Sequence, residues 1–279
     1  MPKYLRVHSV DQALECLSDG PWRIIAGGTD VYPALGEGPM RDDILDISGL
    51  RDLRGIRRDG DAWRIGALTT WTDVLRADLP AWFDGLKLAA REVGSVQIQN
   101  AGTVAGNVCN ASPAADGTAA LMALDAAVEV SGPAGLRVQP LGDFVTGVRR
   151  TTLAPGELVT AVIVPDGGEA GVSDFLKLGA RHYLVISIAM VSVVLRLSGG
   201  SIARAGVAVG SCSPVARRLP DLEARLAGRA PEGLAALVED GDAAVLSPID
   251  DVRASAAYRR EAALTLVRRA LTRCEEALR

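Results

Sequence analysis

The sequence is poor in the residues that most protein metal sites and catalytic triads use. It contains four cysteines, none in a CxxC pair, and only two histidines, His8 and His182. Zinc and iron–sulfur sites need clustered ligands of these types, and a histidine-based triad would have to depend on one of the two. We therefore expect no metal in this chain, and we expect the cysteines to be small buried thiols: Cys16, Cys109, Cys212 and Cys274.

Basic clusters and long apolar runs are also missing. The formal net charge is −4, and no basic stretch with interleaved aromatic residues could follow a nucleic-acid backbone or an acidic membrane. No apolar run reaches the roughly 18 residues of a membrane span, and the first residues lack the apolar core of a signal peptide. We therefore expect a cytoplasmic protein that binds neither nucleic acid nor membrane.

What is present is a composition typical of globular proteins. Hydrophobic residues make up 48% and charged residues 23% of the 279 residues, a length that suits two domains. Because aromatic residues make up only 4%, alanine, valine, leucine and isoleucine must supply most of the core. The stretch "PDGGEAG" at 165–171 is the most linker-like in the chain. We expect one domain over 1–170 and a second over 171–279.

Short helices and strands alternate in the first of these domains. "SVDQALECLSD" predicts a helix capped by Ser9, "TTWTDVLRAD" predicts one capped by Thr70, and "GLKLAAREVGS" predicts a third. "AALMALDAAVEVSGPAGLRVQPL" predicts a helical turn, a strand, a Gly-Pro turn and a second strand. Further strands are predicted in "WRIIAGG", "DDILDIS", "LRGIRRDG", "AWRIGAL" and "GELVTAVIVP".

The second domain has a different pattern. Three strand-like runs joined by tight glycine turns predict an antiparallel sheet: "VSDFLKLGA", "VISIAMVSVVLRL" and "SIARAGVAVGS". From Ala254 onward the sequence is helical, and we expect its arginines to form a solvated face. The buried stripe of this helix is predicted to contain Leu264, Val267, Leu271, Cys274 and Leu278.

Two glycine-containing loops are the strongest candidates for a binding site. In "AGGTD", at residues 26–30, a strand enters Gly27 and Gly28 before a helix, which leaves backbone N–H groups free to bind an anion. Thr29 can add an amide and a hydroxyl. The Asp30 carboxylate would repel phosphate, so we expect it to point away and cap the helix.

The second loop, "GTVAGNVCN", repeats this logic about seventy residues later. Its expected amide donors are Gly102, Thr103, Ala105, Gly106 and Asn107. Either loop alone is more simply interpreted as a tight turn, but two such loops suit two linked phosphates, and the polar residues Asn107, Asn110 and Asp116 close to the second loop favour a site. Because neither loop contains lysine or arginine, binding would depend on main-chain dipoles.

Two charged residues outside the loops are further candidates. A carboxylate such as Asp116 can accept two hydrogen bonds from a ribose diol, and it could equally cap the helix "GTAALMAL". Lys177 is one of only three lysines and lies in a predicted strand just before "GARHY". A compact ammonium at this position could face an electron-rich ring system.

Several stretches match one known family in order and spacing over nearly the whole chain. They resemble the FAD-binding (medium) subunits of the xanthine dehydrogenase and carbon monoxide dehydrogenase type of molybdenum hydroxylase. The "NASPAAD" version is most similar to the xanthine dehydrogenase branch. The matching stretches are "AGGTD", "IGALTT", "GTVAGNVCNASPAAD", "LDAAVEV", "PGELVTAVIVP", "FLKLGAR" and "PIDDVRASAAYRR".

This resemblance implies an α+β fold. It comprises an FAD domain of the vanillyl-alcohol-oxidase-like (PCMH) type, made of two α/β subdomains, and a C-terminal domain with a three-stranded antiparallel sheet and a helical bundle. It also implies that residues of both loops hold the FAD pyrophosphate. In the first loop these are Gly27, Gly28, Thr29 and Val31, with Ala26 and Asp30 completing the loop. In the second loop they are Thr103, Ala105, Gly106 and Asn107.

The remaining implied contacts concern the other parts of FAD. Asn110 and Asp116 would contact the ribityl or ribose region, Val159 would lie near the adenine, and Lys177 would lie near the flavin. One position departs from the family pattern, because many relatives have glycine where this chain has Ala105. If that position needs a positive φ, alanine costs about 1 kcal/mol or more.

The implied function is electron transfer within a multi-subunit enzyme. A molybdopterin-binding large subunit oxidises the substrate, a small subunit passes electrons through [2Fe–2S] clusters, and the FAD of this subunit passes them to NAD or another acceptor. A second hypothesis is a free-standing FAD oxidase or dehydrogenase in which His182 or Tyr183 acts as base. A third is an assembly subunit without flavin, for which Ala105 is the only indication.

Overall fold

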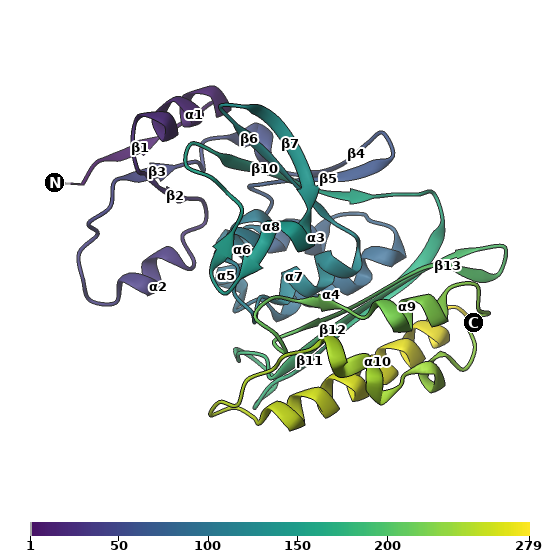
Figure 1. Ribbon diagram of the computed structural model, residues 1–279. Helices are drawn as coiled ribbons and strands as arrows, with labels where there is room; N and C mark the ends of the chain where they lie inside the picture. The colour runs from purple at the N-terminus through teal and green to yellow at the C-terminus, as the bar shows by residue number, and fades with distance from the viewer. Residues whose placement is uncertain (1) are drawn as a thin grey trace.

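A five-stranded antiparallel sheet is the scaffold of the N-terminal part of the computed structural model, which describes residues 2–279 (Figure 1). Its middle strand is β10 (Leu158–Pro165), which is almost entirely buried. The near-continuous apolar run "LVTAVIVP" accounts for this position, because a central strand covered on its faces needs apolar side chains on both. In the order of the sheet the other strands are β4 (Ile56–Asp59) and β5 (Ala62–Gly66) on one side and β6 (Ala127–Gly132) and β7 (Gly135–Pro140) on the other.

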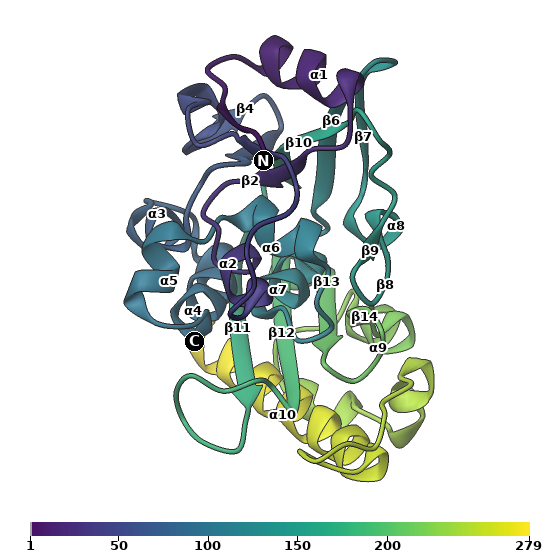
Figure 2. The ribbon, with the colours of Figure 1, turned by 90° about the vertical axis from the view of Figure 1, so that its left-hand side faces the viewer.

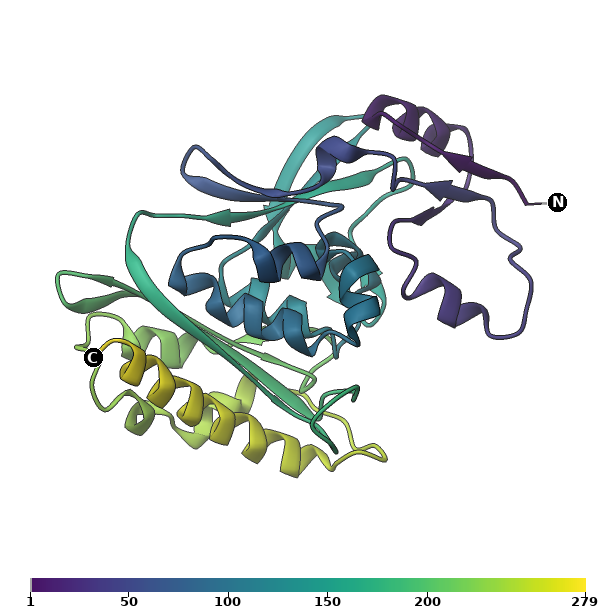
Figure 3. The ribbon, with the colours of Figure 1, turned by 180° about the vertical axis from the view of Figure 1, so that it is seen from behind.

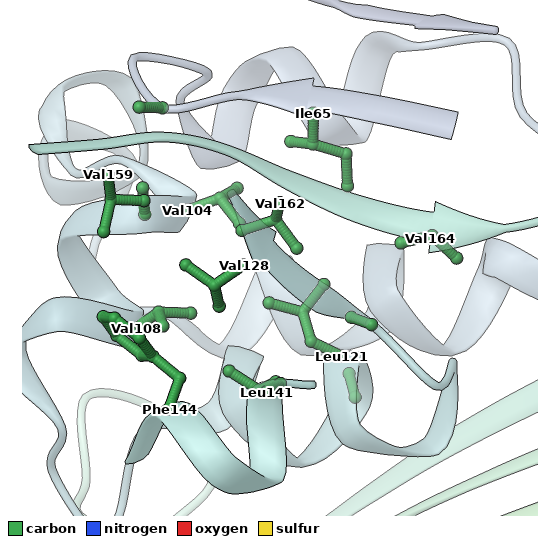
Figure 4. Packing of buried hydrophobic residues seen from close by; sticks show 14 of the residues in the cluster. Ile65, Val104, Val108, Leu121, Val128, Leu141, Phe144, Val159, Val162 and Val164 are labelled. Carbon is green, nitrogen blue, oxygen red and sulfur yellow. The ribbon is translucent and has the colours of Figure 1, made fainter. Parts of the chain in front are cut away.

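Short helices cover one face of this sheet. Figure 4 shows Val104 and Val108 of one helix and Leu121 of another packed against Val128 and Val162 of the strands. The core is mainly aliphatic, as the composition predicts, although Trp71, Phe83 and Phe144 are also fully buried. The helices are α3 (Trp71–Arg76), α4 (Asp84–Glu92), α5 (Val96–Ala101), α6 (Val104–Asn110), α7 (Asp116–Ala123) and α8 (Leu141–Phe144).

The two predicted helix caps are confirmed. The Ser9 side chain accepts a hydrogen bond from the Gln12 amide at the start of α1 (Val10–Asp19). At the start of α3, Thr70 and Asp73 form a reciprocal capping box. Each cap satisfies backbone donors that a helix leaves unpaired at its N-terminus.

A small parallel sheet stands apart at the N-terminus, in the order β1 (Tyr4–Arg6), β3 (Ile44–Asp46) and β2 (Arg23–Ile25). Figure 2 is viewed from this side and shows α1 above it. The loop between β2 and β3 carries α2 (Val31–Leu35), which buries none of its residues. This loop begins with the first glycine-containing segment, so the small sheet positions that segment.

The C-terminal part contains the predicted antiparallel sheet. β11 (Ala170–Leu178), β12 (Ala189–Ser198) and β13 (Ser201–Gly210) are its three long strands, and a two-residue strand, β14 (Arg217–Arg218), is added at one edge. The long helix α10 (Ala256–Ala277) lies along one face of this sheet (Figure 3). Smaller elements complete the chain: α9 (Pro220–Leu226), the hairpin strands β8 (Val145–Gly147) and β9 (Arg150–Thr151), and 3₁₀ turns at Arg51–Leu53, Ala81–Phe83, Leu234–Leu237 and Asp240–Val245.

The buried stripe of α10 is as predicted, but its arginine face is not. Leu264, Val267, Leu271 and Cys274 are buried, and Leu278 is partly buried against them. Arg259, however, is only 3% exposed and donates hydrogen bonds to backbone carbonyls of the neighbouring segments and to Asp251. The expectation of a wholly solvated arginine face was therefore wrong. Neither α10 nor any other helix within residues 2–279 combines the length and apolar character that crossing a bilayer requires.

The opposite face of the C-terminal sheet packs on α4 and α7. Side chains of this face, among them Phe175 and Met190, join the hydrophobic core of the N-terminal part. Arg196 of β12 stacks on Trp82, with its guanidinium carbon 3.8 Å from the ring centroid. The boundary predicted near residue 170 falls at the start of β11, while the apolar core continues across it.

A buried ion pair connects strands of the five-stranded sheet and supplies a test of its stability. Arg64 of β5 donates two hydrogen bonds to Glu129 of β6, and Thr160 of β10 donates a third. We expect Arg64→Met to lower the free energy of unfolding by about 3 kcal/mol, because it leaves a poorly hydrated carboxylate unpaired. The matched substitution Arg57→Met removes an exposed arginine and should change the free energy of unfolding by less than about 0.5 kcal/mol. Chemical denaturation at neutral pH measures both, and equal effects would contradict the prediction.

The same pair gives the stability a defined pH dependence. Burial alone would raise the pKa of the Glu129 carboxyl, but the hydrogen bonds from Arg64 and Thr160 outweigh it and hold the pKa below its ordinary value of 4.5. The stabilisation from this group is therefore present above pH 4.5 and is lost as the pH falls through the folded-state pKa. Denaturation of the parent and of Arg64→Met should therefore show that the difference between their free energies of unfolding becomes smaller as the pH falls below 4.5.

Candidate functional site

A cavity of about 590 Å³ lies where the small parallel sheet meets α5, α6 and the end of β10. Its volume is within the range of cavities that enclose a large organic ligand. Of the residues predicted for the site, Lys177 alone does not line this cavity. Those that line it are Ala26, Gly27, Gly28, Thr29, Asp30, Val31, Thr103, Ala105, Gly106, Asn107, Asn110, Asp116 and Val159.

The two glycine-containing loops meet at one wall of the cavity. A Cβ atom added to Gly27 would lie 1.8 Å from the carbonyl oxygen of Ala101, which no side chain could tolerate. In the reverse direction, a Cβ atom on Gly102 would lie 3.2 Å from the Thr29 hydroxyl. Segments about seventy residues apart in the sequence are therefore in backbone contact and can share a ligand.

The first loop presents open backbone donors. Within residues 2–279, the amides of Gly27, Gly28 and Thr29 form no hydrogen bond to another residue. Gly28 is buried and has a φ of 70°, a conformation that residues with a Cβ atom rarely adopt. A buried amide such as that of Gly28 is nearly always paired, so the free donors of this loop fit a ligand that carries anionic oxygens.

The second loop is less open than predicted. The Gly106 amide donates to the Thr103 hydroxyl at 3.0 Å, and the Asn107 amide donates to the Thr103 carbonyl oxygen at 3.0 Å. The expectation that these amides are free was wrong, because Thr103 accepts both at the start of α6. It was also wrong for Gly102, whose amide donates to the Ile98 carbonyl oxygen at 2.7 Å. The structure also removes the concern about Ala105, which lies in the first turn of α6 and not at a positive φ, so alanine causes no backbone strain there.

Two polar side chains beside the second loop have defined surroundings. The side-chain oxygen of Asn107 is buried without a hydrogen-bond donor among residues 2–279, and Asn107 lines the cavity. Asp116 is also buried and accepts hydrogen bonds from Lys177 at 2.8 Å and from Ser187 at 2.9 Å. The Asn107 oxygen is enclosed by protein atoms, so it is other atoms of this residue that face the cavity.

The structure excludes one of the two roles considered for Asp116. Asp116 is the first residue of α7 and its carboxylate does not cap that helix, so the capping alternative was wrong. Burial raises the pKa of the carboxyl, opposed by the adjacent ammonium of Lys177. Lys177 is held behind Asp116, where its side chain is only 8% exposed, and does not itself line the cavity.

The expectation that Asp30 points away from the site and caps α2 was also wrong. Asp30 forms no side-chain cap on α2, and its carboxylate instead accepts a hydrogen bond from the Asn110 side chain at 2.7 Å while lining the cavity. Asn110 in turn accepts one from Arg149, a cavity residue that the sequence did not indicate. Arg149 lies in the turn between β8 and β9, and nothing in the local sequence signals that this turn reaches the cavity.

The remaining chemically active side chains fit a binding role better than a catalytic one. Cys109 lines the cavity, and burial raises the pKa of its thiol to about 12, so it is not a nucleophile at neutral pH. The cysteines are only partly as expected, because Cys16 and Cys109 are half-buried while the other two are buried. Neither His182 nor Tyr183, the bases considered for direct catalysis, lines the cavity.

Comparison with known proteins identifies the ligand that such a cavity takes. Residues 1–167 match the family described as the FAD binding domain in molybdopterin dehydrogenase, and residues 174–274 match the CO dehydrogenase flavoprotein C-terminal domain. The medium chain of glyceraldehyde dehydrogenase from Sulfolobus acidocaldarius is 30% identical, with 96% of each chain aligned. The xanthine dehydrogenase FAD-binding subunit of Escherichia coli O157:H7 is also 30% identical, over 96% of this chain and 94% of that one.

A shorter sequence match and a structural superposition point to the same family. The nicotinate dehydrogenase FAD-subunit of Eubacterium barkeri is 37% identical, but the match spans only 61% of this chain and 59% of that protein. A chain of carbon monoxide dehydrogenase from Hydrogenophaga pseudoflava superposes with a TM-score of 0.87 at 28% identity, covering 98% of this chain and 96% of that one. The resemblance drawn from the sequence is thereby confirmed, as are the α+β fold and FAD as cofactor. The chain belongs to the FAD-binding medium subunits of the xanthine dehydrogenase and carbon monoxide dehydrogenase family of molybdenum hydroxylases.

Proposed function

We propose that this subunit relays electrons that a partner has extracted from a substrate, from [2Fe–2S] clusters through its FAD to NAD or another acceptor. The observation that carries the proposal is the cavity itself: the free amides of its first loop and its apolar wall residues suit a large bound cofactor, and both carboxylates on its wall already have partners, Asp30 in Asn110 and Asp116 in Lys177. In such a site the flavin supplies the redox chemistry, and the protein supplies binding and position.

The residues around the cavity suggest how FAD would be held. The free amides of Gly27, Gly28 and Thr29 would bind the pyrophosphate, and the Thr103–Asn107 turn would lie against it. Asn107 would lie against the cofactor at the same turn. Ala26 and Val31 flank the first loop, and Asn110, Asp116 and Val159 line the rest of the binding surface.

Lys177 would act on the flavin through Asp116 and not by direct contact. Its ammonium is 2.8 Å from the Asp116 carboxylate and also approaches the Glu92 carbonyl oxygen at 3.4 Å. With one charge of each sign, the pair keeps this part of the cavity close to neutral. Asp116 can therefore accept hydrogen bonds from a cofactor hydroxyl without presenting a net negative charge to the flavin.

The names of the relatives support a multi-subunit setting. Those of Hydrogenophaga pseudoflava and Sulfolobus acidocaldarius are medium chains of carbon monoxide dehydrogenase and glyceraldehyde dehydrogenase. We propose a molybdopterin-binding large subunit, which oxidises the substrate, and a small subunit with [2Fe–2S] clusters as the partners of this chain.

Substitution of the glycine at the contact between the loops tests the cavity as the FAD site. We expect Gly27→Ala to purify without bound flavin, because the added methyl group meets the Ala101 carbonyl and forces the loops apart. Gly20→Ala is the matched control, since Gly20 has an extended φ of 171° and no atom within 4 Å of the added carbon. Visible flavin absorbance of the two purified variants is the measurement. Retention of the full flavin content by Gly27→Ala would contradict the location of the site.

The relay function is tested by asking what reduces the flavin. The purified subunit alone should leave its flavin oxidised when mixed with any hydroxylase substrate, whereas addition of a chemically reduced iron–sulfur small subunit should bleach it. Stopped-flow absorbance in the flavin band follows both reactions. Turnover of an organic substrate by the lone chain, free of molybdenum and iron, would instead support the free-standing oxidase or dehydrogenase.

A further inference from the structure

Four charged side chains line the cavity, and three of them are accounted for. Arg23 pairs with Asp42 at the surface, and Asp116 pairs with the buried Lys177. The Asp30 carboxylate accepts a hydrogen bond from the side-chain amide of Asn110. Arg149 is left as the one cavity cation that has no carboxylate within 4.0 Å among residues 2–279.

The position of Arg149 is set by several contacts. Its backbone amide donates to the Ala111 carbonyl oxygen at 2.9 Å, which ties the β8–β9 turn to the end of α6. Its guanidinium donates to the side chain of Asn110 and approaches the Asn110 carbonyl oxygen at 3.3 Å. Arg149 and Ala111 both have left-handed backbone conformations, with φ values of 57° and 46°. Such conformations in residues other than glycine persist only where the surroundings impose them.

Asp30, Asn110 and Arg149 together form a strap at the opening of the cavity. Asn110 joins the other two residues, which come from the first loop and from the β8–β9 turn. Asp30 and Arg149 are exposed, so the strap lies at the mouth and not in the depth of the cavity. Figure 2 shows the β8–β9 hairpin on the flank of the molecule below β7.

The cavity wall next to Arg149 is apolar. Leu153, Leu158 and Val159 follow Arg149 in the sequence and line the same cavity. The segment 149–159 therefore combines an unpaired cation with a surface suited to a flat apolar ring. An adenosine diphosphate group needs both features, because it carries an anionic diphosphate and a planar base.

We propose that Arg149 binds the diphosphate of the ADP half of FAD, and that Asn110 positions its guanidinium for this contact. The diphosphate must bind beside the carboxylate of Asp30, which repels it, and the main-chain donors of the two loops carry no full charge to compensate. A guanidinium at the mouth supplies that charge and can pair with two phosphate oxygens at once. The proposal depends on FAD occupying this cavity, which the Gly27→Ala variant tests independently.

Binding of ADP and FAD to the flavin-free subunit tests this role. We expect Arg149→Met to weaken both ligands by about tenfold or more, the range that a hydrogen bond to a charged group contributes. Arg149→Lys should recover part of the loss because it restores the charge. Arg150→Met is the matched control, since Arg150 is exposed on the same hairpin, does not line the cavity and should leave both affinities unchanged. Isothermal titration calorimetry gives the dissociation constants.

Salt dependence and melting separate a charge contact from a structural role. The parent and Arg150→Met should bind ADP more weakly as the salt concentration rises, and this dependence should be flatter in Arg149→Met. All variants without ligand should melt at the same temperature, because the substituted side chains are exposed. The proposal is overturned if Arg149→Met binds ADP like the parent with the same salt dependence, or loses affinity for FAD alone. Loss of flavin in Gly27→Ala alongside that result would leave the cavity assignment intact and refute only the role of Arg149.

Discussion

The contact between the Gly27 backbone and the Ala101 carbonyl is the constraint on which the site depends. Because Gly27 has no Cβ atom, the two loops can approach to the distance of backbone atoms, and both line one cavity. The small parallel sheet positions one loop and the helices on the five-stranded sheet position the other. Any change that separates these two parts opens the cavity along the wall where they meet.

The charges around the cavity are arranged so that a dianionic ligand meets little net repulsion. Asp116 is compensated by Lys177 inside the protein, where an unpaired carboxylate would be costly. Asp30 at the mouth is linked through Asn110 to Arg149. The first loop contributes amide groups, which attract phosphate oxygens without needing counter-ions of their own. On the proposed assignment, FAD would be held by main-chain dipoles and one exposed cation.

Sequence reasoning succeeded where the determining interactions are local. Ser9 and Thr70 cap their helices as predicted, because a cap depends on residues three positions apart. It failed for Asp30 and Arg259, whose partners lie 80 and 71 positions away in the chain. Asp116 is similar, since its carboxylate pairs with Lys177, 61 positions away, and does not cap α7. A polar side chain binds the best donor or acceptor in space, which local sequence does not reveal.

The sequence by itself determined the family, the alternation of helices and strands, and the two loops whose glycines admit close backbone contact. These features depend on short motifs and on periodic burial, both of which are written in neighbouring residues. Only the tertiary structure decided that the loops face each other, that Thr103 takes two of the expected amides, and that Arg149 reaches the same cavity. Those outcomes depend on how separate elements pack, because packing alone brings residues about 120 positions apart, such as Asp30 and Arg149, to one opening.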